Sequence, residues 1–92
     1  MGAPRRFRSG LRAIQGKAQA MQRFVINTRT QFNGEHEVHN ITAGCPYLPP
    51  EPYRLDLGVH PHCQSALAEA RRNWPLRRIN GCPWCARECH SR

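Results

Sequence analysis

Five cysteines and five histidines lie in a chain of only 92 residues, all of them from His36 onward. The large apolar side chains that build a core are scarce, because Leu, Ile, Val and Phe together number 16, and the formal net charge is +8. A chain with few large apolar residues and a high charge does not fold by hydrophobic burial alone. The sequence therefore predicts a small domain that a metal ion or disulfide bonds hold together.

The strongest motif is Cys82-Pro83-Trp84-Cys85, near the C-terminal end of the sequence. Two thiolates separated by two residues can both bind one Zn²⁺ at about 2.3 Å in a tight turn. The same spacing occurs in redox dithiols, where the pair precedes most of a thioredoxin-like domain. Only seven residues follow Cys85, so we expect zinc rather than redox chemistry at this motif.

A closed structural zinc site needs four ligands, and the Cys-x2-Cys turn supplies two of them. Cys45, in a second turn of sequence Ala-Gly-Cys-Pro, is the expected third ligand. The fourth stays open among His39, which is close to Cys45 in sequence, Cys63, at the start of an expected helix, and Cys89. One helical turn would bring Cys89 over Cys85 and give a cluster of thiolates.

A β-hairpin is expected just before Cys45. Residues 24–32 are rich in β-branched and aromatic side chains, and the Asn33-Gly34 pair that follows is the strongest short hairpin signal. Residues 35–41 should then form the return strand. With a two-residue loop, His39 would lie on the face that carries the apolar side chains of the first strand, such as Phe24.

The remaining elements complete a small α+β, zinc-stapled domain over residues 21–92. Prolines exclude a regular helix over most of residues 44–61, which we expect to be a proline-rich loop. Residues 61–73 predict one helix, since Pro61 suits the first helical position and apolar residues recur at helical spacing. The expected fold is thus a β-hairpin, a proline-rich loop, one helix and a C-terminal Cys-x2-Cys turn.

The positive charge is concentrated at the N-terminal end. Residues 1–34 hold seven basic residues and no acid, whereas residues 35–92 hold seven basic and six acidic residues. Basic arms commonly contact nucleic acid or anionic surfaces, although a solvated tail is an alternative. We expect residues 1–20 to be a flexible arm and nucleic acid to be the leading partner. The expected contacts in the arm are Arg5, Arg6, Arg8, Arg12 and Lys17.

Signatures of enzymes are missing from the sequence. Zinc hydrolases often carry His-Glu-x-x-His on a helix, but His36-Glu37-Val38-His39 is one residue short and lies in an expected strand. The sequence also contains neither a glycine-rich phosphate loop nor the Gly-x-Ser-x-Gly of serine hydrolases. We therefore expect a non-catalytic module. A protein-interaction module that uses its prolines and Trp74 or Trp84 is the main alternative, and a small metalloenzyme is a further one.

The sequence also bears on location. No apolar run approaches the ~20 residues that a membrane-spanning helix needs, and residues 11–20 include Arg12 and Lys17, which a secretory signal would not carry in its apolar segment. We expect a cytoplasmic protein with no membrane partner. In a reducing compartment, five cysteines bind metal more readily than they form disulfides.

Several motifs together resemble a group of small, uncharacterised bacterial proteins rich in Cys and His, which begin near Met21. The motifs are Asn33-Gly34-Glu35-His36-Glu37-Val38-His39, Leu57-Gly58, Cys63-x2-Ala66-Leu67, Asn80-Gly81-Cys82-x2-Cys85 and Cys89-His90. More distantly, the order of hairpin, Cys, helix and Cys-x2-Cys is similar to the metal-binding domain of the Ada alkylation-repair protein. That domain uses two close cysteine pairs, whereas Cys45 has no Cys three or four residues away, so the resemblance implies shared architecture and not methyl transfer.

Overall fold

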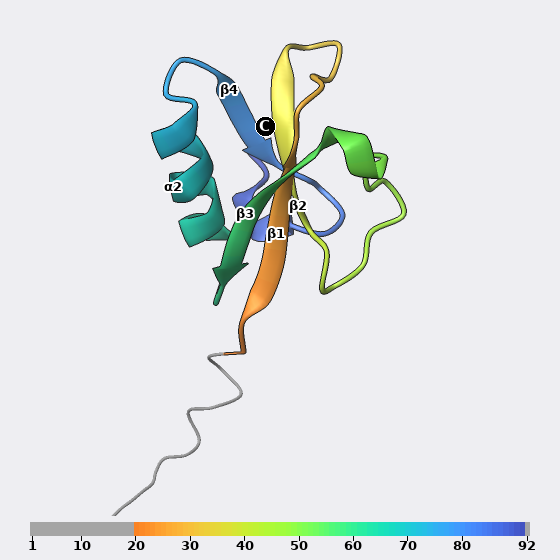
Figure 1. The fold of residues 1–92 in the computed structure, drawn as a ribbon, viewed down its shortest axis with the longest axis vertical. Helices are drawn as coiled ribbons and strands as arrows, with labels where there is room; N and C mark the ends of the chain where they lie inside the picture. The colour runs from red at the N-terminus through yellow and green to blue at the C-terminus, as the bar shows by residue number, and fades with distance from the viewer. Residues whose placement is uncertain (1–19, 92) are drawn as a thin grey trace, which may run out of the picture.

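The computed structural model describes residues 20–91 and confirms a small α+β domain. Its elements are β1 (Gln22–Asn27), β2 (Glu35–Asn40), the 3₁₀ turn η1 (Glu51–Tyr53), β3 (Arg54–His60), α2 (Cys63–Asn73), β4 (Arg78–Gly81) and the 3₁₀ turn η2 (Arg87–Cys89). The four strands form one sheet in the order β3-β1-β2-β4. Figure 1 shows α2 on one side of this sheet and the loop between β2 and η1 on the other.

The expected hairpin of β1 and β2 is present, but its register differs from the expected one. Val25 lies opposite His39, because residues 28–34 form a longer loop in place of a two-residue turn. The pairing is displaced by an odd number of residues, which reverses the faces of the return strand. His39 therefore lies on the face opposite to Phe24 and Ile26, and the expectation that it shares their face is wrong.

Two further strands lie in segments where the sequence predicts loops or turns. β3 follows the last proline of the loop and pairs antiparallel with β1 across a bulge near Phe24. Gly58 faces Phe24 there and has a φ of 88°, a left-handed conformation that glycine adopts without strain. β4 pairs parallel with β2 at the other edge of the sheet. The proline-rich loop is thus confined to residues 41–53.

The apolar core lies between α2 and the sheet. α2 confirms the expected helix, and the side chain of His62 caps its first turn by accepting a hydrogen bond from the Ser65 amide. Small residues on the helix allow it to approach the strands closely. The buried residues of the core are Phe24, Ile26, Val38, Leu57, Cys63, Ala66, Leu67, Ala70 and Ala86. Among residues 20–91, no helix has the length and apolarity needed to cross a membrane.

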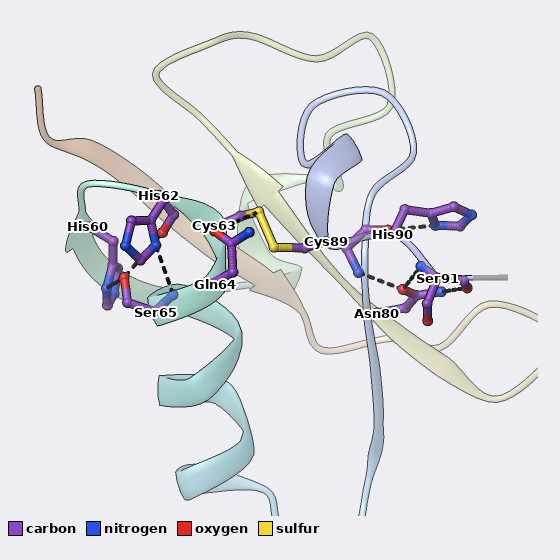
Figure 2. The surroundings of a disulfide bond; sticks show 10 residues. His60, His62, Cys63, Gln64, Ser65, Asn80, Cys89, His90 and Ser91 are labelled. Carbon is purple, nitrogen blue, oxygen red and sulfur yellow. Dashed lines mark hydrogen bonds between the residues drawn. A yellow bond between two sulfur atoms is a disulfide. The ribbon is translucent and has the colours of Figure 1, made fainter. Parts of the chain in front are cut away.

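A disulfide bond between Cys63 and Cys89 joins the start of α2 to η2 (Figure 2). Gly81 allows this approach, because a Cβ at that position would lie 2.8 Å from the Ala86 carbonyl oxygen and 2.9 Å from the Cys89 Cβ. The expectation that the cysteines bind metal rather than form disulfides is therefore wrong for these two residues. η2 packs against α2 and the sheet, and this packing directs Cys89 toward Cys63 instead of toward Cys85.

Candidate metal centre

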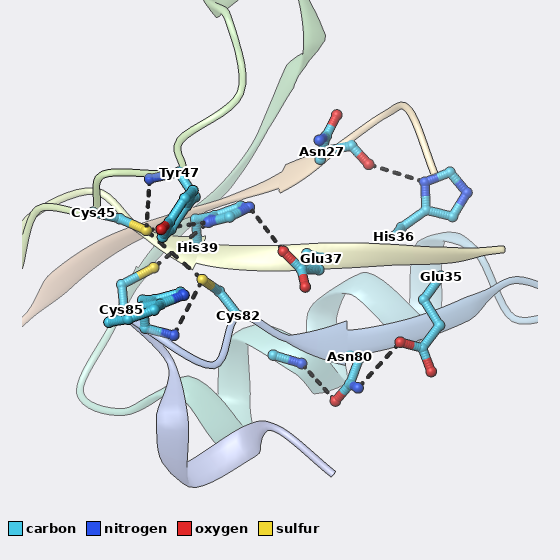
Figure 3. Close-up of polar contacts among 12 residues, drawn as sticks. Asn27, Glu35, His36, Glu37, His39, Cys45, Tyr47, Asn80, Cys82 and Cys85 are labelled. Carbon is cyan, nitrogen blue, oxygen red and sulfur yellow. Dashed lines mark hydrogen bonds and ion pairs between the residues drawn. The ribbon is translucent and has the colours of Figure 1, made fainter. Parts of the chain in front are cut away.

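Four potential metal ligands converge near the end of β2 (Figure 3). They are the imidazole of His39 and the thiols of Cys45, Cys82 and Cys85, whose ligand atoms all lie within 4.8 Å of one another. The Nδ1 atom of His39 lies 3.8 Å from the Cys45 Sγ and 3.6 Å from the Cys85 Sγ. The Sγ atoms of Cys45 and Cys82 are 3.7 Å apart.

These three separations are close to the edges of a tetrahedral zinc site, and the other pairs of ligand atoms lie within 4.8 Å. With Zn–S bonds of about 2.3 Å and a Zn–N bond of about 2.0–2.1 Å, the tetrahedron has S···S edges of about 3.8 Å and S···N edges of about 3.6 Å. His39 and Cys82 are buried, and Cys45 and Cys85 are partly buried. Three thiols and one imidazole at these distances can hold a metal ion.

The parallel pairing of β4 with β2 positions two of the four ligands. Val38 lies opposite Gly81, and the ladder continues because the Cys82 amide donates a hydrogen bond of 2.9 Å to the Val38 carbonyl. Cys82 therefore stands beside His39, the residue that follows Val38. The Ala86 amide donates to the Cys82 carbonyl at 2.9 Å, and this bond closes the turn that returns Cys85 to the same point.

Cys45 reaches the site through a tight reversal of the chain after β2. The Ala43 amide donates to the side-chain oxygen of Asn40 at 2.9 Å, and the Gly44 amide donates to the Ile41 carbonyl at 3.1 Å. Gly44 has a φ of 84°, which favours glycine at this position. The reversal brings Cys45 back over the face of the sheet that carries His39.

Backbone amides point at each of the three sulfur atoms. The Asn40 amide donates to the Cys85 Sγ at 3.2 Å, the Tyr47 amide to the Cys45 Sγ at 3.4 Å and the Trp84 amide to the Cys82 Sγ at 3.4 Å. Hydrogen bonds of this kind stabilise the charged thiolate relative to the neutral thiol. The backbone of the site thus suits sulfur in its metal-binding form.

The protonation of the site favours metal binding by the imidazole. Burial, followed by the charge of Arg54, lowers the pKa of His39 to about 4, so the ring is neutral near pH 7 and can donate a lone pair to a metal. Its Nε2 atom lies 3.7 Å from a carboxylate oxygen of Glu37 (Figure 3). A carboxylate behind a metal-bound histidine orients the ring.

Burial acts in the opposite direction on the thiols. It raises the pKa of Cys82 and of Cys85, and the backbone amides that face these sulfur atoms counter part of this effect. Without a metal ion, both thiols therefore keep their protons near pH 7. Metal binding must displace these protons, which makes the affinity dependent on pH.

The structure brings together four of the six candidate ligands and separates the other two from them. Cys63 and Cys89 are joined to each other in the disulfide, so neither is the fourth ligand, and the expected helical turn that stacks Cys89 over Cys85 is wrong. Sequence reasoning missed Glu37 and Arg54 as neighbours of His39. Alternation along the expected strand could have placed Glu37 on the same face as His39, whereas Arg54, in β3, comes near His39 only in the folded sheet. The expected nucleic-acid contacts, from Arg5 to Lys17, lie outside the described residues.

Four protein ligands complete a tetrahedral shell, and such a closed set is typical of structural metal sites rather than of catalytic ones. Comparisons of the chain with models of protein families, with curated proteins and with solved structures found no match. The interpretation of the site accordingly depends on its own geometry and chemistry.

Substitution of a ligand should have a different effect from removal of the disulfide. Cys82→Ser should abolish stoichiometric metal binding, because it deletes one of the three sulfur ligands. A variant with Cys63→Ser and Cys89→Ser should keep the metal and lose about 2–4 kcal/mol of unfolding free energy, the usual contribution of a disulfide. Metal content and chemical denaturation of the two variants would test this, and loss of metal from the double variant would contradict it.

The dependence of metal affinity on pH should show that three thiols release protons when the metal binds. Burial raises the pKa of Cys82 and of Cys85, so protons compete with the metal there and affinity rises with pH, while His39 contributes little above about pH 5 because its pKa is about 4. Between about pH 5.5 and 7.5, log K should rise by about three per pH unit. Competition titrations with a chromophoric chelator measure this slope.

His39→Cys provides the matched control, since it adds a fourth thiol and should raise the slope to about four. A slope of about two in the unsubstituted protein would mean that only two of the three cysteines bind the metal.

Proposed function

We propose that this chain is a non-catalytic zinc-binding module whose fold depends on one Zn²⁺ bound by His39, Cys45, Cys82 and Cys85. The observation that carries the proposal is the agreement between three ligand–ligand separations of 3.6–3.8 Å in the structure and the edges of a tetrahedral site. Thiolate and imidazole ligands together suit zinc among the common metal ions. When bound, the ion would act as a cross-link and leave no open position for a substrate.

The small apolar core supports a structural role for the metal. A core in a domain of this size rarely supplies more than about 3–5 kcal/mol, whereas structural zinc sites in small domains show apparent binding free energies of about 10–16 kcal/mol. The four ligands come from β2, the loop that follows it and the turn after β4. A metal bound there ties this loop and this turn to the sheet.

Removal of the metal should therefore unfold the domain. Native mass spectrometry of the full chain should find one zinc ion per chain, and a strong chelator should abolish the dispersion of the amide resonances because the remaining core is too small. Addition of zinc should restore the spectrum. Native-like amide dispersion in the metal-free protein, with the Cys63–Cys89 disulfide reduced, would contradict the proposal.

Nucleic acid is the partner class that the charge distribution favours. Residues 1–34 carry seven basic residues without an acid, and phosphate contacts by Lys and Arg supply most of the affinity of non-specific nucleic-acid binding. In this proposal the arm at residues 1–20 contributes phosphate contacts, and the metal-bound domain is the folded part of the chain to which the arm is joined. Arginines that contact only phosphates give no base preference.

The salt dependence of binding tests the role of the arm. If the arm neutralises four or five phosphates of duplex DNA, log K should fall with log salt concentration with a slope of roughly −4 to −5. Replacement of all five basic residues of the arm by Gln should flatten this slope and leave zinc content and thermal unfolding nearly unchanged. Fluorescence anisotropy of both proteins across a salt series measures it, and identical isotherms would end the nucleic-acid proposal for the arm.

A further inference from the structure

Two exposed aromatic side chains stand beside the metal centre. Tyr47 and Trp84 are 58% and 61% exposed, and their ring centroids lie 5.4 Å apart with the ring planes at 42°. Each follows a Cys-Pro pair, Cys45-Pro46 in one turn and Cys82-Pro83 in the other. The two turns that supply three of the four candidate ligands thus also present two neighbouring aromatic rings to solvent.

The same turns restrain the backbone that carries both rings. The amide of Tyr47 donates to the Cys45 sulfur and the amide of Trp84 to the Cys82 sulfur, each at 3.4 Å. The two sulfur atoms are themselves 3.7 Å apart. Because the rings also contact each other, stacking of a flat ligand on the pair requires less ordering than stacking on two independent side chains.

The rings border a depression of about 430 Å³ on the surface, a size within the usual range for ligand sites. Its lining residues are Gln31, Glu37, Tyr47, Leu48, Cys82, Pro83 and Trp84. These residues supply aromatic faces, one carboxylate and one amide, and no basic side chain. The depression therefore suits the flat and uncharged part of a ligand and does not suit a phosphate.

Basic side chains lie near this depression but do not line it. Arg87 lines a second depression that also includes Trp84, where Glu88 accompanies it, and most of the excess positive charge of the chain lies in residues 1–34, which hold seven basic residues and no acid. Aromatic rings next to basic residues are the combination that binds single-stranded nucleic acid, with bases stacked on the rings and phosphates near the cations.

We infer that Tyr47 and Trp84 form a nucleobase-stacking site that distinguishes single-stranded from duplex nucleic acid. A base in a duplex already stacks on its neighbours and exposes no face to a protein ring, whereas an unpaired base does. The inference rests on the proposed nucleic-acid function and adds that the preferred ligand is single-stranded. In this arrangement the arm binds phosphates of any strand, and the aromatic pair adds affinity for unpaired bases only.

The test compares the affinities of full-length, zinc-loaded proteins for a labelled single strand of about 12 nucleotides and for its duplex. Trp84→Ala should weaken binding to the single strand about 5- to 150-fold, the range found for loss of one stacked base, and leave duplex binding unchanged. Tyr47→Ala should act in the same direction. Trp84→Phe should keep most of the affinity because it keeps an aromatic face.

Two controls separate stacking from general surface effects. Phe32 is fully exposed in the loop between β1 and β2, so Phe32→Ala removes an aromatic ring away from the metal-binding turns and should change neither affinity. Trp74→Phe leaves Trp84 as the sole tryptophan of the chain, and the single strand should then quench its fluorescence while the duplex should not.

The outcomes distinguish this inference from the proposal on which it rests. Unchanged single-strand affinity in both Tyr47→Ala and Trp84→Ala, with zinc content intact, would overturn the stacking site and leave the arm's salt-dependent binding in place. Failure of the unsubstituted protein to bind either oligonucleotide would overturn the nucleic-acid function and the stacking site with it.

Discussion

The parallel pairing of β4 with β2 is the constraint on which the rest of the structure depends. A four-residue strand with little apolar character of its own lies against β2 through the match of Val38 with Gly81, and the next residue along, Cys82, arrives beside His39. The turn after β4 then returns Cys85 to the site, and η2 follows from there to Cys89. One short ladder thus sets the positions of both the candidate metal centre and the disulfide.

The disulfide and the proposed metal centre would both compensate for the small core, and they lie in different parts of the fold. The disulfide joins α2 to η2, on the side of the sheet where the apolar residues lie. The His-Cys cluster joins the loop after β2 to the sheet and to the turn after β4. Residues 41–53 hold four prolines and form no strand, so a metal bound by Cys45 would add a restraint on this loop close to Tyr47.

Local patterns in the sequence were sufficient for the α+β class, for α2 and for the Cys82–Cys85 turn, since each depends on residues close together in the chain. Features of the fold that depend on contacts between distant residues were not predicted from the sequence. The register of β2 follows from the loop at residues 28–34, and β4 is a strand only because β2 lies beside it. Cys89 was expected near Cys85 from helical spacing, but the close approach of Gly81 to η2 directs it to Cys63.

The central claim is that one metal ion binds to three sulfur atoms and one nitrogen atom. X-ray absorption spectroscopy at the zinc edge of the purified full-length protein tests it most directly. A site of this composition should give three Zn–S distances of about 2.3 Å and one Zn–N distance of about 2.0–2.1 Å, with the nitrogen contribution lost in His39→Cys. A first shell of four sulfur atoms in the unsubstituted protein, or one with fewer than three sulfur atoms, would contradict it.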